Sequence, residues 1–61
     1  MVMMSNRIPL GSRWSVTWRG LSVVVQVASY RPPFCVCQIE GTLLTVELLP
    51  VELDFFGRRL K

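Results

Sequence analysis

Cys35 and Cys37 form a C-x-C motif, the arrangement in this 61-residue chain that most invites metal or redox chemistry. A structural zinc site needs four ligands, and the sequence has no histidine and no third cysteine. A disulfide between residues two apart on an extended strand would be badly strained. We therefore predict no metal and no cofactor, and interpret the cysteines as two small buried thiols in a reducing cytosol. The alternative is a metal or disulfide site shared between two chains.

The residue types that catalysis needs are scarce. The absence of histidine removes the commonest general base, and the serine and threonine hydroxyls have no evident base beside them. Glu47, Glu52 and Asp54 are expected on a solvated face rather than as a catalytic carboxylate pair. The glycines are spaced as turn residues and form no phosphate-binding loop. We predict that the chain is not an enzyme.

The stretch RWSVTWRG combines two tryptophans with two arginines. In an extended strand, alternate side chains point to opposite faces, so Trp14, Val16 and Trp18 would share one face. Arg13 and Arg19 would lie on the other. This pattern predicts a half-buried strand whose tryptophans pack in a core or an oligomer interface and whose arginines face solvent or a partner.

Charge is distributed unevenly along the chain. The first 34 residues hold four arginines and no acid, whereas the remainder holds four acids and three cations, for a net charge of +3. A basic half indicates an anionic partner, nucleic acid first, although a solvated basic face is the simpler interpretation. The candidate nucleic-acid-binding residues, with the tyrosine as a stacking platform, are Arg7, Arg13, Arg19, Tyr30 and Arg31.

The spacing of apolar and turn residues predicts an all-β fold. Four to five short antiparallel strands are expected at residues 13–19, 21–30, 34–40, 43–49 and 54–57. The first two would form a hairpin turning at the sequence RGL, with Tyr30 on the polar face of the second. A single 3₁₀ turn is expected near residues 50–53, and a helix over 43–56 is the alternative, which Pro50 interrupts.

The strand pattern also predicts the division of the chain. Residues 1–7 are expected to form a flexible tail, 8–57 a single small β domain and 58–61 a basic C-terminal tail.

This layout resembles the SH3-like small barrels. The resemblance covers residues 8–56 and rests on the opening strand LGSRWSV, the valine-rich second strand and the ending VELLPVELDFF. In such barrels a final 3₁₀ turn separates the last two strands, and the family includes nucleic-acid binders, peptide binders and oligomeric scaffolds. The chain departs from the members that bind proline-rich peptides, because it lacks an acidic first loop and the aromatic cluster of their groove.

The high apolar content favours an interaction protein. Hydrophobic residues make up 51% of a chain that, at this size, buries only about 60% of its unfolded surface, so apolar side chains should remain exposed. We predict a protein-interaction module, such as an accessory, inhibitor or assembly subunit, that binds a protein partner or forms a homo-oligomer. Its predicted interface residues are Phe34, Phe55, Phe56 and Leu60. The alternative is a nucleic-acid-binding small barrel that uses an arginine-rich face.

The sequence gives no indication of a membrane protein. It has no run of about 20 apolar residues, and its first residues lack the pattern of a signal peptide. We therefore expect a cytoplasmic protein that does not associate with membranes.

Overall fold

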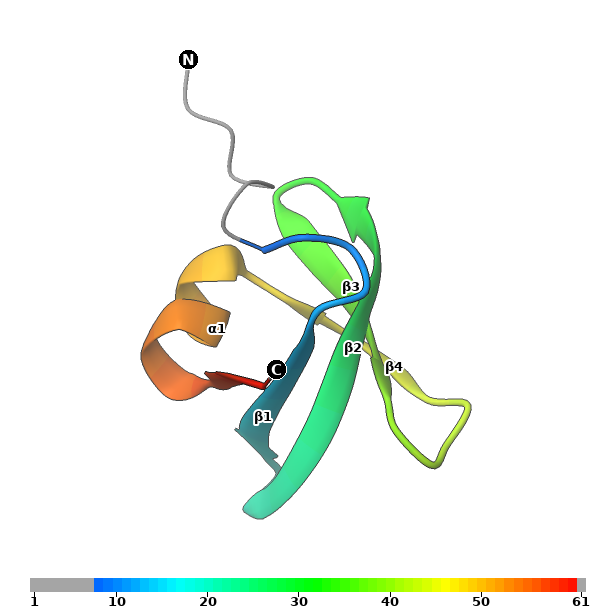
Figure 1. Ribbon diagram of the computed structural model, residues 1–61, viewed down its shortest axis with the longest axis vertical. Helices are drawn as coiled ribbons and strands as arrows, with labels where there is room; N and C mark the ends of the chain where they lie inside the picture. Colours follow the sequence, from blue (N-terminus) through cyan, green and yellow to red (C-terminus); the bar gives the residue numbers. More distant parts are fainter. Residues whose placement is uncertain (1–7, 61) are drawn as a thin grey trace.

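The computed structural model describes residues 8–60, which form one antiparallel sheet of five strands with one short helix (Figure 1). The strand order across the sheet is β4-β3-β2-β1-β5. The elements are β1 (Arg13–Trp18), β2 (Leu21–Arg31), β3 (Phe34–Ile39), β4 (Thr45–Leu48), α1 (Pro50–Phe56) and β5 (Arg58–Leu60). The all-β prediction is confirmed. The predicted tail at residues 1–7, which includes Arg7, lies outside the described residues. Lys61 also lies outside them.

The predicted hairpin between the first two strands is present. Trp18 pairs with Leu21, so the loop consists of Arg19 and Gly20 alone. Both loop residues have positive φ, 52° and 77°, which is the backbone of a type I′ turn, whose twist matches that of the flanking strands. The Arg19 guanidinium lies over the ring of Trp18, 4.7 Å from its centroid.

One face of the sheet forms the core. Trp14 and Val16 are buried on β1, as the alternation predicted, and Leu53 covers them from α1 together with Ile8, which precedes the sheet. Figure 1 shows α1 to one side of the bent sheet, close to β1 and β5. The buried apolar residues are Ile8, Trp14, Val16, Val25, Val27, Cys35, Cys37, Ile39 and Leu53. We call this face of the sheet the inner face and the opposite one the outer face.

The predicted 3₁₀ turn is in fact the start of an α-helix that runs from Pro50 to Phe56. Proline fits the first helical position, because its missing N–H would have no intrahelical partner there. The backbone N–H of Leu49 donates to the Glu52 carboxylate at 2.7 Å, and the N–H of Gly57 donates to the Leu53 carbonyl at the other end. Pro50 therefore begins a helix rather than only ending a strand, and the helical alternative is right for residues 50–56 alone.

The fifth strand was predicted in the wrong place. Residues 54–56 belong to α1, and the strand that follows is β5, in the segment that was expected to be a basic tail. It pairs antiparallel with β1, with Arg59 opposite Trp14 and Leu60 opposite Arg13. β5 is only three residues long, so its own sequence does not show that it pairs with β1.

The sheet is open. β4 and β5 stand at the two ends of the strand order, and no pairing joins them within residues 8–60. Among the described residues the expected barrel closure is therefore not present, and each of these two strands has one edge that no other described strand pairs.

A β-bulge changes the orientation of Tyr30. The register between β2 and β3 shifts between Val27 and Ser29, so one additional residue enters β2 and the alternation of faces reverses after it. Tyr30 consequently pairs with Cys35 and packs against the core. The prediction that Tyr30 lies on the polar face is wrong for this reason.

Candidate functional site

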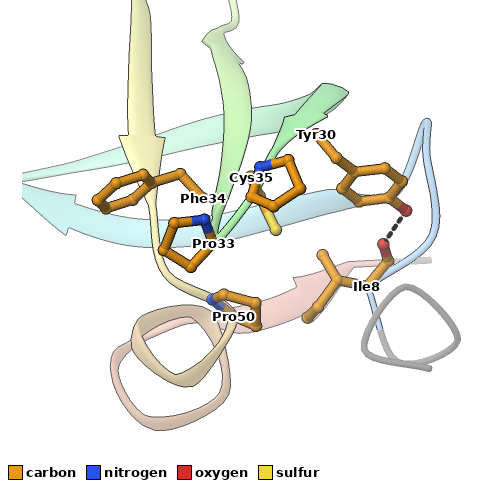
Figure 2. Close-up of a pocket in the computed structure, with 7 residues that line it drawn as sticks. Ile8, Tyr30, Pro33, Phe34, Cys35 and Pro50 are labelled. Carbon is orange, nitrogen blue, oxygen red and sulfur yellow. Dashed lines mark hydrogen bonds between the residues drawn. The ribbon is translucent and has the colours of Figure 1, made fainter. Parts of the chain in front are cut away.

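An apolar pocket of about 190 Å³ lies where the turn between β2 and β3 meets the start of α1. Figure 2 shows the ring of Tyr30 and the side chains of Ile8 and Pro50 around it. We call this cavity the proline pocket; its lining residues are Ile8, Tyr30, Pro32, Pro33, Phe34, Cys35 and Pro50.

The chemistry of the proline pocket suits an uncharged guest. None of the described residues that line it carries a charge, and the Tyr30 hydroxyl already donates to the Ile8 carbonyl oxygen. Burial raises the pKa of the Cys35 thiol, which therefore stays protonated at neutral pH. An apolar cavity of about 150 Å³ is large enough to bind benzene. The proline pocket is thus large enough for one aromatic or branched aliphatic side chain.

The second apolar feature is the exposed side of α1. Only Pro50 and Leu53 of this helix are buried, whereas Val51 is 49% exposed and Phe55 and Phe56 are each 77% exposed. Val51 and Phe55 are four residues apart and so share a helix face. The two phenylalanine ring centroids lie 6.4 Å apart. We call Val51, Phe55 and Phe56 the helix patch.

The structure brings together only part of the predicted protein interface. Phe55 and Phe56 lie side by side in the helix patch, whereas Phe34 lines the proline pocket at the other end of α1. Leu60 is half-buried on β5, beside Arg13 in an open cleft. The four residues therefore belong to three places on the surface.

Sequence reasoning missed the proline pocket. In the sequence, the two prolines after Arg31 and the one at position 50 indicate only breaks between elements. A cluster of prolines beside Tyr30 and Phe34 was the available signal, but the distance in sequence between Pro33 and Pro50 hid their proximity.

The predicted nucleic-acid-binding arginines are partly engaged within the chain. The Arg13 guanidinium donates from Nε and Nη2 to both carboxylate oxygens of Glu40, the second bond at 3.0 Å, and Arg31 donates to Glu47 at 3.1 Å. Hydrogen bonding from Arg13 lowers the pKa of Glu40, so this carboxylate is ionised at neutral pH. Acids from the second half of the chain thus neutralise two cations of the first half.

The other candidates for nucleic-acid contact do not form a common surface with these two. Arg19 stacks on Trp18 at the tip of the hairpin, and Tyr30 is half-buried with its hydroxyl already bonded. Arg7 lies outside the described residues.

The cysteines are core residues. Both thiols lie on the inner face, and burial, followed by the proximity of Cys35, raises the pKa of Cys37 to about 11. No cluster of three potential metal ligands occurs in the part of the chain that the structure describes. Cys35 is 2% exposed and Cys37 is fully buried, which argues against the interchain site considered above.

Comparison with known proteins adds no assignment: the chain matches no family model, and no curated protein or solved structure shows significant similarity to it. Within residues 8–60, α1 is too short to span a membrane.

Proposed function

We propose that this chain is a small non-enzymatic protein-interaction module that uses its exposed apolar side chains to bind a protein. We also propose that its fold is an SH3-like small barrel left open between β4 and β5. The order of the strands and the short helix before the last strand support this fold assignment.

The observation that carries the functional proposal is the exposure of the helix patch. Phe55 and Phe56 are two of the three phenylalanines in a chain too small to have many core residues, yet each is 77% exposed. Burying such a ring contributes about 1.5–3 kcal/mol, and aromatic side chains are common anchors of protein interfaces. The proline pocket offers a second contact, complementary to an apolar side chain of the partner.

Nucleic-acid binding is the second candidate. It is favoured by Arg58 and Arg59, which are exposed on β5 and form no ion pair with another described residue. The pairing of Arg13 and Arg31 with acids weakens it. Binding through phosphates would fall steeply with salt, whereas binding through the helix patch would not.

The test compares three forms of the full chain: wild type, the double variant Phe55→Ser/Phe56→Ser, and the control Leu43→Ser. Leu43 is 93% exposed in the turn between β3 and β4, away from α1, so the control removes apolar surface at another place. Each form is incubated with nuclease-treated extract of the source cells and joined to its neighbours with a bifunctional cross-linker.

Wild type and Leu43→Ser should give the same cross-linked protein species, including any formed by two copies of the chain. The double variant should lose them while keeping the circular-dichroism spectrum of the wild type. Identical cross-linked species in all three forms, or none with the wild type, would refute the proposal.

A further inference from the structure

We propose that the protein partner is a second copy of this chain, joined by antiparallel pairing of β4 in one copy with β5 in the next. The proposal rests on the proposed function, because it names the partner of the same interaction module.

The backbone provides the first argument. β4 and β5 are the edge strands of the open sheet, so one side of each presents backbone N–H and C=O groups that no strand of residues 8–60 pairs. Such edges are templates for another strand. Because a copy has one edge of each kind, a β4 edge can meet a β5 edge in every contact of an assembly.

The charges on the two edges are complementary. Glu47 lies on the outer face of β4 opposite Val36, and Arg58 lies on the outer face of β5 opposite Ser15. Arg31 bonds to one carboxylate oxygen of Glu47, and a carboxylate can accept about four hydrogen bonds, so Glu47 can also take a cation from a neighbour.

Complementarity of charge also selects the kind of pairing. A symmetric contact of β4 with β4 centred on Glu47 would set two Glu47 side chains opposite each other, and one of β5 with β5 would bring arginines of the two copies together. Like charges on paired strands are destabilising. Only the β4-to-β5 contact sets opposite charges against each other.

One register of this pairing sets opposite charges against each other and also keeps the opposed side chains on the same face of the sheet. Placing Glu47 opposite Arg58 puts Thr45 opposite Leu60, and both of these residues lie on the outer face. A shift by one residue would oppose outer-face side chains to inner-face ones, which the pleat forbids. The paired segments are then residues 45–48 of one copy and 57–60 of the next.

The same register brings the two apolar features together. Beyond the paired segment, Leu49 and Pro50 of one copy continue toward Phe56 and Phe55 of the next. Pro50 lines the proline pocket, and Cys35, which also lines it, pairs with the last residue of β4. We therefore place a phenylalanine ring of the helix patch in the proline pocket of the neighbouring copy, where the volume of about 190 Å³ accommodates it.

Pairing of unlike edges is a head-to-tail contact. It leaves a free β4 on the first copy and a free β5 on the last, so copies continue to add until a ring closes or a filament forms.

The test measures the light-scattering mass of the purified full chain across a range of concentrations. The wild type should exceed its monomer mass of 7.0 kDa. Glu47→Arg and Arg58→Glu, each alone, should raise the concentration needed for assembly by at least about tenfold, because each places like charges across the contact. Leu43→Ser, in the turn before β4 and outside the paired residues 45–48, should assemble like the wild type.

The decisive arm mixes the two charge variants. In an equimolar mixture, Arg at position 47 of one variant faces Glu at position 58 of the other, and the remaining contact keeps its native charges, so assembly should return in alternating order. A monomeric wild type, a normal assembly of either variant alone, or a mixture that stays dissociated would overturn this pairing. If the wild type is monomeric but the cross-linking experiment still finds a Phe55- and Phe56-dependent partner, the self-pairing fails and the proposed function stands.

Discussion

Replacing Leu53 with alanine should remove half or more of the stability of this fold. The Leu53 side chain is fully buried between α1 and the sheet, and it is the one large apolar side chain of the helix that is buried. Truncating a buried leucine to alanine costs about 2–5 kcal/mol, including the cavity that remains. A chain of 61 residues is expected to have a total unfolding free energy of about 3–9 kcal/mol. The variant should therefore lose about half or more of its unfolding free energy, and its urea midpoint should fall by a comparable fraction.

Urea denaturation followed by tryptophan emission measures this loss, because Trp14 is buried in the same core. The matched control is Val51→Ala in the same helix, where the side chain is 49% exposed and the loss should stay below about 1 kcal/mol. Equal shifts of the urea midpoint in the two variants would show that α1 does not close the core through Leu53, and would refute the reasoning.

Three further predictions concern the polar and titratable groups. Cys37 has a pKa of about 11, against an ordinary 9.0, so its protonated thiol stabilises the fold fully below pH 9. As the pH rises through 11 this contribution is lost, and the free energy of unfolding should fall by about 2–3 kcal/mol. The free energy of unfolding of Cys37→Ala should fall less over this range, and an equal fall would contradict the assignment. Tyr30→Phe removes the hydrogen bond to the buried Ile8 carbonyl, so thermal or urea unfolding should show a loss of about 1 kcal/mol, and an unchanged midpoint would argue against that bond. In Arg13→Gln the pKa of Glu40, followed by NMR titration, should rise toward its usual value; a pKa that does not move would mean that Arg13 is not its partner in solution.

The sequence was sufficient for the features that depend on alternation and on local turn chemistry. The burial of Trp14 and Val16 follows from a period of two, and the Arg19-Gly20 loop follows from the glycine between two strand patterns. Both are properties of neighbouring residues, which a single sequence displays directly.

Features that depend on distant residues were not predictable. The bulge near Ala28 reverses the face of Tyr30 because of how β2 pairs with β3, and nothing in the local pattern marks it. The sequence FFGRRL has no strand alternation of its own, and β5 exists because β1 offers an edge to pair with. Pro50 was interpreted as a breaker, although proline serves equally well as the first residue of a helix.

In the candidate site, too, features of single residues could be predicted from the sequence, whereas contacts between distant residues could not. Phe55 and Phe56 were predicted from the excess of apolar residues in so short a chain, and they are exposed. The proline pocket and the Arg13–Glu40 pair join residues that are far apart in sequence, so they required the folded structure.

The most direct test of the central claim is to install p-benzoylphenylalanine in place of Phe55 in the full chain, irradiate it in cell extract and identify by mass spectrometry what the ring has joined. The proposal predicts adducts with protein, and for the pairing of two copies an adduct within the peptides around Phe34 or Pro50. Adducts with nucleic acid alone, or no adduct with any macromolecule, would contradict the claim that this exposed ring is a protein-binding surface.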